Sequence, residues 1–121
     1  MVSRWGWGTR VSLWSLALLA SCGEPQIYAW GHYEDSVYRL GRRDADFNPD
    51  EEIAILTEDV RKAVTAGRLV PPGLYMHLGY LHSLKHDSGA AVKYFRMEKE
   101  AFPESSVFVE GVIARLATPK P

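Results

Sequence analysis

The sequence predicts an all-α domain built from short antiparallel helical hairpins. Apolar side chains recur at intervals of three and four residues in five segments, which is the spacing of one face of a helix. Residues that favour helix starts and stops separate these segments. No segment shows a convincing alternation of apolar and polar residues, the pattern expected of a half-buried strand.

The first predicted helix lies within residues 27–41. Gly41 is expected to end it, and the polar residues 42–50 connect it to the next segment. Its apolar residues have helical spacing and are expected to share the core-facing side: Trp30, Tyr33, Val37 and Leu40.

The second predicted helix has a well-marked start and end. Asn48 is a good N-cap, Pro49 suits the first helical position, and the acidic residues 50–52 lie where the helix dipole favours negative charge. Gly67 is expected to cap the C-terminus, and the Pro71–Pro72 pair prevents continuation. The predicted apolar stripe consists of Ile53, Leu56, Val60, Ala63 and Val64.

Three more helices are predicted over residues 73–86, 90–102 and 104–116, and Ser88 and Ser105 are expected to act as helix caps. The domain then covers residues 27–117, and residues 118–121 form a tail that is expected to fray. The inward-facing residues are expected to be Leu74, Tyr75, Leu78 and Leu81 in the third helix, Ala91, Tyr94, Phe95 and Phe102 in the fourth, and Val107, Phe108, Val112, Ile113 and Leu116 in the fifth.

The third and fourth segments together resemble one tetratricopeptide repeat, a helix-turn-helix unit of about 34 residues. The positions that carry the resemblance are Tyr75, Leu78, Gly79, Ala91, Phe95 and Pro103. Two positions depart from it, because His82 stands where tyrosine is usual and Glu98 where alanine is usual. Gly79 and Ala91 are expected to be the small residues at a close crossing of two antiparallel helices, with turns at Pro71, Pro72 and Gly73 before them and at Pro103 after them.

Residues 30–70 are interpreted as a degenerate first unit of the same kind. Two units and a final helix are fewer than the roughly three repeats that such a stack needs to be stable alone. An open end of the stack exposes apolar surface unless another chain covers it. This organisation therefore predicts a protein partner.

The first 21 residues have the layout of a signal peptide. Two arginines precede the uncharged run "VSLWSLALLA", and no acidic residue comes before Glu24. The run is shorter than the roughly 20 apolar residues that a membrane-spanning helix requires. Residues 1–21 are therefore predicted to be removed, and residues 22–26 to form a tether.

The residues Leu19, Ala20, Ser21 and Cys22 resemble the lipobox of bacterial lipoproteins. The resemblance implies that the thiol of Cys22, the only cysteine in the chain, carries a diacylglyceryl group and becomes the new N-terminus. Each buried acyl methylene contributes about 0.8 kcal/mol, so such an anchor holds a small domain firmly to a bilayer. The alternative is a buried free cysteine, which the polar residues after Cys22 do not favour. This covalent lipid is the only non-protein group expected, and no cofactor is predicted.

Charge and cysteine content restrict the classes of partner and the cellular compartments that are consistent with the sequence. Without Arg4 and Arg10, the 14 basic residues fall to 12 against 15 acidic ones, which leaves no basic footprint for nucleic acid. A single cysteine permits no internal disulfide, so stability must come from packing. In Gram-negative lipoproteins an aspartate after the cysteine usually marks inner-membrane retention, so Gly23 favours the periplasmic face of the outer membrane.

Nearly the whole mature chain, from Cys22 to about Val112, resembles a family of small bacterial lipoproteins of unknown function, the DUF4810 type. The segments that carry the resemblance are the lipobox, "YAWGHYEDSVY", "VPPGLYMHLGYLH" and "EKEAFPES". Family members often occur beside other lipoproteins, one of them similar to the curli-secretion channel. The resemblance implies envelope lipoproteins, including a curli-secretion-channel-like protein, as partners in an outer-membrane assembly or export complex.

Four aromatic residues near the tether are candidate contact residues: Tyr28, Trp30, Tyr33 and Tyr38. Core packing is one role for them, and contact with a partner protein or with the bilayer surface are the others. The number of aromatic residues in so short a segment exceeds what one short helix needs to bury.

The sequence contains no convincing catalytic constellation. Glu98, Glu100, Glu104 and Glu110 alternate with basic residues, as on an exposed helix, and the serines lack a nucleophile context. His82 and His86 are weak metal candidates, because they stand four residues apart on a predicted helix without a third ligand. The protein is predicted to be a non-enzymatic, lipid-anchored interaction module. A small-ligand or metal-binding lipoprotein and an envelope hydrolase are the alternatives.

Overall fold

The computed structural model describes residues 26–118, and this part of the chain contains five α-helices and no strand. One isolated parallel bridge joins Tyr28 to Leu69. The predicted all-α fold is confirmed. None of the helices in residues 26–118 is long and apolar enough to cross a membrane. The elements are α1 (Tyr33–Arg42), α2 (Pro49–Thr65), α3 (Leu74–Leu84), α4 (Ser88–Ala101), the 3-10 turn η1 (Pro103–Ser105) and α5 (Ser106–Ala117).

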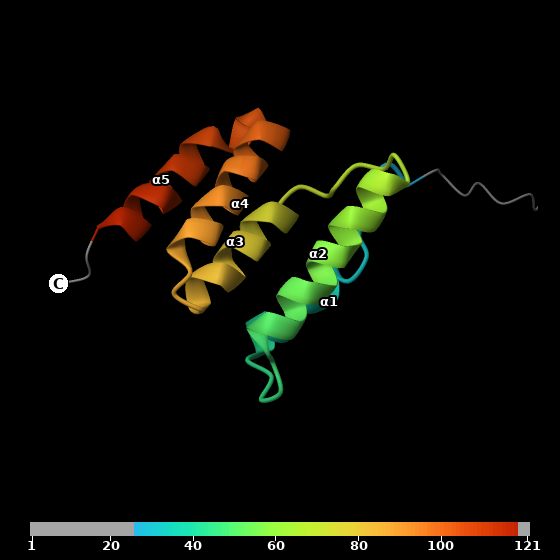
Figure 1. Ribbon diagram of the computed structural model, residues 1–121, viewed down its shortest axis with the longest axis horizontal. Helices are drawn as coiled ribbons and strands as arrows, with labels where there is room; N and C mark the ends of the chain where they lie inside the picture. The colour runs from blue at the N-terminus through green and yellow to red at the C-terminus, as the bar shows by residue number, and fades with distance from the viewer. Residues whose placement is uncertain (1–25, 119–121) are drawn as a thin grey trace, which may run out of the picture.

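The helices form a stack in which α3 lies between the first pair of helices and α4 (Figure 1). α3 packs against α2 on one side and α4 on the other, and α5 packs against α4. The core has two clusters. One joins Leu56 of α2 to the buried side chains of α3, and the other joins Ala91 and Phe95 of α4 to Val109 of α5.

The most extensive packing in the stack is that of α3 against α4, which approach each other closely at Gly79. A Cβ at Gly79 would lie 2.4 Å from Cε1 of Phe95 and 3.0 Å from the carbonyl oxygen of Ala91. The first distance is too short for any Cβ and the second is tight, so a side chain at this position would displace the Phe95 ring or separate the two helices. Ala91 is itself fully buried at the crossing.

Local capping explains most helix ends. The Asn48 side chain accepts a hydrogen bond from the backbone N–H of Asp50 at 3.0 Å, Pro49 opens α2, and Gly67 follows it with a φ of +65°. The prediction for Gly41 is wrong, because α1 continues through it to Arg42 and is capped by Arg43, which has a φ of 56°. A single exposed glycine costs a helix only about 1 kcal/mol, which neighbouring turns offset.

The start of α4 also differs from the prediction. Asp87 is the N-cap and accepts a hydrogen bond from the N–H of Ala90 at 3.1 Å, so the helix already begins at Ser88. Ser105 occupies the N-cap position of α5, but its hydroxyl donates to the carbonyl oxygen of Phe102 at 2.7 Å instead of accepting from the helix. The serines were predicted from residue preference alone, and neither side chain acts as a helix cap.

The buried face of α1 is centred on a polar residue that was not predicted. Ser36 is 1% exposed, whereas Trp30 precedes the helix and is exposed together with Val37. Tyr33 and Leu40 do pack against the core, as predicted. The buried face of α1 is therefore rotated by about one residue from the predicted face. The reason is that Ser36 has a hydrogen-bond partner in the core, the His77 ring.

The buried face of α5 is likewise shifted from the prediction. Val109 is fully buried, whereas Val107 is 86% exposed and Phe108 is also exposed. Val64, predicted to belong to the stripe of α2, is exposed too. An apolar run along a helix allows more than one buried face, and the position of the neighbouring helices decides between them. The predicted inward residues of α3 are all buried.

We expect Gly79→Leu to destabilise the protein by about 1–3 kcal/mol, because the added side chain must separate α3 from α4. Urea unfolding followed by circular dichroism measures the change. Gly41→Leu is the matched control, since a Cβ there meets no atom within 4 Å. Equal stability of the two variants would contradict a close crossing at Gly79.

Candidate functional site

An apolar groove of about 550 Å³ runs between α1, α3 and α5. Three of the large side chains that line it are also exposed, namely Val37, Tyr80 and Phe108. Exposed apolar concavities of this kind are typical of binding sites. The full lining is Tyr33, Val37, Gly73, Met76, His77, Tyr80, Phe95, Glu98, Ser105, Phe108 and Val112. We call it the α1–α3–α5 groove.

The groove continues along α1 into a smaller hollow of about 330 Å³. This hollow shares Tyr33 and Val37 with the groove and adds Trp30, Glu34 and Tyr38. The ring of Trp30 stacks on that of Tyr33, with 6.3 Å between centroids and 9° between planes. Three of the four aromatic residues that were predicted as contact residues therefore line one continuous surface.

The fourth aromatic residue lies beside this surface. The ring of Tyr28 meets that of Trp30 edge to face, with 6.1 Å between centroids. Tyr28 is half-buried, and its backbone pairs with Leu69. Among the four, Trp30 and Tyr38 are exposed and Tyr33 packs partly against the core. The segment thus combines core packing with exposed aromatic surface.

The groove and the adjoining hollow carry negative charge without a basic residue among the lining residues. Glu34 and Glu98 are the acidic members of the two linings, and neither lining contains lysine or arginine. Among the other residues of the two linings, His77 alone has a side chain of the type that ordinarily changes charge near neutral pH. A ligand that brings a positive charge beside apolar groups matches this surface best.

Glu98 lies at the base of the groove and caps a neighbouring helix. It is 3% exposed, and its Oε1 accepts a hydrogen bond of 2.7 Å from the backbone N–H of Gly73, at the N-terminus of α3. Its Oε2 has no hydrogen-bond partner among residues 26–118. Burial raises the pKa of the Glu98 carboxyl, and the backbone N–H groups of Gly73, Met76 and Tyr75 oppose that rise. The prediction that this acid belongs to an exposed helix face is wrong, because the start of α3 supplies its partners.

Asp59 makes the equivalent contact in the first pair of helices. It is 8% exposed and accepts a 2.7 Å hydrogen bond from the backbone N–H of His32, just before α1, while the His32 ring lies 3.0 Å away. A Cβ at Gly31 would lie 2.4 Å from Oδ2 of Asp59, and Gly31 has a φ of +50°. In both hairpins, a carboxylate of the second helix therefore caps the first. This parallel supports the interpretation of residues 30–70 as a degenerate first unit.

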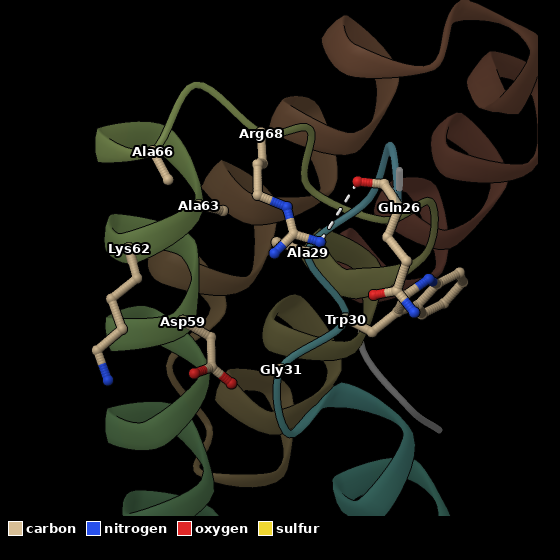
Figure 2. Close-up of a pocket in the computed structure, with 9 residues that line it drawn as sticks. All are labelled: Gln26, Ala29, Trp30, Gly31, Asp59, Lys62, Ala63, Ala66 and Arg68. Atoms are coloured by element: carbon tan, nitrogen blue, oxygen red, sulfur yellow. Dashed lines mark hydrogen bonds between the residues drawn. The ribbon is translucent and has the colours of Figure 1, made fainter. Parts of the chain in front are cut away.

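A more polar cleft of about 440 Å³ lies between residues 26–31 and the second half of α2 (Figure 2). Arg68 spans it and donates to the carbonyl oxygens of Gln26 and Tyr28, at 3.4 and 2.8 Å. Asp59 also lines it. The third charged residue of the lining is the exposed Lys62. Because the protein's own backbone already engages Asp59 and Arg68, and the lining has fewer large apolar side chains, this cleft is a weaker candidate than the groove.

A serine and a histidine meet inside the fold. The hydroxyl of Ser36 in α1 lies 2.9 Å from Nε2 of His77 in α3, and both residues are buried. Burial lowers the pKa of the His77 imidazole, and the charge of Glu52 opposes this effect. The neutral ring is therefore favoured. With Ser36 enclosed, the pair links α1 to α3 and offers no exposed nucleophile.

The two histidines that were considered as metal ligands do not share a helix face. α3 ends at Leu84, and His86 lies in the following turn with a φ of +60°. His82 stacks on Tyr94 instead, with 5.3 Å between ring centroids. No group of three potential metal ligands is present within residues 26–118. The i, i+4 arrangement was wrong because the turn into α4 begins before His86.

A model of the family described as a domain of unknown function (DUF4810) matches residues 27–112. The chain belongs to this family. The match confirms the family that was predicted from the sequence. No curated protein and no solved structure matches the chain. The predicted lipobox residues Leu19, Ala20, Ser21 and Cys22 lie outside both the matched and the described residues.

Two buried acids of this DUF4810 domain were not predicted. Glu52 is 3% exposed and pairs with Arg39 of α1 at 2.5 Å, and Asp59 caps α1 as described above. Both acids lie three or four residues from the buried Leu56, so they share its face of α2. This spacing from Leu56 was the one feature of the sequence that could have predicted their burial. It was not used, because acidic residues are normally assigned to the solvent-exposed face of a helix.

We expect this DUF4810 domain to lose stability as the pH falls through about 6.5, the ordinary pKa of histidine. The folded state holds His77 neutral, so below that pH the unfolded state binds more protons and is favoured. Melting temperatures of wild type and His77→Gln between pH 8 and pH 5 measure this. Glutamine retains a hydrogen-bonding group for Ser36 but does not titrate, so its melting temperature should fall less; parallel curves would contradict the assignment.

Proposed function

We propose that this protein is a lipid-anchored, non-enzymatic interaction module at the periplasmic face of the outer membrane. In this proposal it docks a segment of another envelope protein in the α1–α3–α5 groove, as an accessory component of an assembly or export complex. The observation that carries the proposal is the groove itself, in which Val37, Tyr80 and Phe108 remain exposed. Large apolar side chains at such a surface favour association with another protein.

The charge of the groove supports a particular kind of occupant. Glu34 and Glu98 line the groove and its extension without a lysine or arginine beside them. An apolar segment that carries a lysine or arginine complements this surface, and charge complementarity mainly adds specificity. Other envelope lipoproteins, including one similar to the curli-secretion channel, are the proposed sources of such a segment.

The place of the groove in the chain supports docking close to a membrane. The aromatic extension begins at Trp30, eight residues after Cys22, the proposed site of lipid attachment. A bound partner would thus lie near the anchor. The enclosure of Ser36 and the structural use of Asp59 and Glu98 as helix caps support a binding role over a catalytic one.

Photo-crosslinking in native membranes tests the docking surface. We expect p-benzoylphenylalanine at position 37 or 80 of the full-length protein to form adducts with the same partner, because both side chains are exposed in the groove. Mass spectrometry of the adducts identifies the partner. Position 64 on α2 is the control, since Val64 is more exposed than Val37 and Tyr80 and lies outside the groove. Adducts at position 64 that equal those at 37 and 80 would refute docking in the groove.

Substitution of the single cysteine tests the anchor separately. We expect Cys22→Ser to accumulate as an unprocessed precursor without acyl chains, because the thiol that accepts the lipid is gone. Intact mass spectrometry and fractionation of membranes against soluble periplasm measure processing and location. Ala20→Gly, which keeps a small residue before the cysteine, serves as a control. A serine variant with the mature mass and the wild-type membrane fraction would show that no lipid is attached at Cys22.

A further inference from the structure

The outward face of α5 is apolar at its centre and charged at its ends. Val107, Gly111 and Ala114 are exposed and lie on the side opposite the buried Val109, and the exposed Phe108 lies at the edge of this side, next to the groove. Glu104, in the 3-10 turn η1, and Arg115 extend a stripe with Phe108 and Gly111, because the spacings of four, three and four residues are those of neighbours on one helix face. Neither charged side chain forms an ion pair within residues 26–118.

Gly111 occupies a place on α5 that corresponds to the helix-crossing glycine of α3. Gly79 follows Pro71 by the same number of residues as Gly111 follows Pro103. The side chain of Phe95 covers Gly79, whereas a Cβ at Gly111 would meet no atom within 4 Å. α5 therefore presents a crossing position to which no helix of the described chain is packed.

We propose that two copies of this protein pair through α5 in an antiparallel, two-fold arrangement. In one register Phe108 of each copy covers Gly111 of the other, as Phe95 covers Gly79 within the chain. The same register places Glu104 of each copy opposite Arg115 of the other, because both pairs are centred on the peptide between Val109 and Glu110. A single two-fold axis thus satisfies the apolar and the charged contacts together, which is the self-complementarity that a symmetric dimer needs.

This pairing goes beyond the docking of a partner in the groove, and the two surfaces meet only at Phe108. The charge pattern favours a second copy over an unrelated helix. A second copy supplies a basic residue opposite Glu104, an acidic residue opposite Arg115 and an aromatic side chain over Gly111, all in one register. An unrelated helix would need all three residues at matching positions by coincidence. Exposed ion pairs contribute modestly to affinity, so their main effect is to set the antiparallel register.

Charge reversal in the full-length protein tests the register. Sedimentation velocity of the detergent-solubilised protein over a dilution series measures the dimer dissociation constant. Glu104→Arg alone and Arg115→Glu alone each place like charges opposite one another twice, and we expect each to raise the constant at least about tenfold. The double variant Glu104→Arg/Arg115→Glu restores the attraction and should return towards wild type. Glu100→Arg, on the exposed side of α4, is the control for a charge change and should leave the dimer unchanged.

Mixing the two single variants gives the sharpest result. A dimer of one Glu104→Arg chain and one Arg115→Glu chain has opposite charges at both contacts, so co-expressed, differently tagged chains should form mixed dimers while each alone is mostly monomeric. Gly111→Leu should also prevent pairing without unfolding the monomer, since the position is open in the single chain. Gly41→Leu, equally open on α1, should leave pairing intact.

Several outcomes would overturn the proposal. A wild-type protein that stays monomeric at every concentration excludes pairing. Dimers that are indifferent to charge reversal and to Gly111→Leu use another surface, and single variants that fail to form mixed dimers exclude the antiparallel register. Loss of dimers with unchanged crosslinks at positions 37 and 80 would leave the docking function standing, so the two proposals fail separately.

Discussion

The close crossing of α3 and α4 at Gly79 is the constraint on which the rest of the structure depends. With no Cβ at this position, Phe95 lies against the helix backbone and the two helices form a tight hairpin. That hairpin fixes the other sides of α3, which pack on Leu56 of α2 and reach Ser36 of α1 through His77. It also presents Phe95 beside Val109 of α5, so every helix of the stack is placed relative to this crossing.

Buried carboxylates connect the two helices of each hairpin in addition to apolar packing. Asp59 and Glu98 satisfy backbone N–H groups at the starts of α1 and α3, which would otherwise lack partners. Glu52 pairs with Arg39 across the first hairpin, where no glycine brings the helices as close. Breaking a buried charge pair by removing one partner is costly, whereas intact pairs add specificity more than stability. These acids therefore fix how the two helices of each hairpin sit together.

Two of the surfaces that the packing of residues 26–118 leaves incompletely covered have different characters. The α1–α3–α5 groove is concave, apolar and acidic, which favours a segment of another protein as its occupant. The outward face of α5 is convex, with a bare glycine at its centre and opposite charges at its ends. A convex helix face with this pattern favours a second helix of the same kind. The small size of the domain explains both, because a short stack cannot cover all of its own apolar residues.

The sequence by itself determined the helical class, most helix boundaries and the crossing glycine. These features depend on residues close in the chain, such as Asn48 and Pro49 at the start of α2, or on size alone, as at Gly79. Only the tertiary structure decided which face of α1 and α5 is buried and why Asp59 and Glu98 are inside. Helical periodicity defines an apolar arc but not the neighbour that covers it, and an acid is buried only where another element supplies hydrogen-bond donors, as the starts of α1 and α3 do for Asp59 and Glu98.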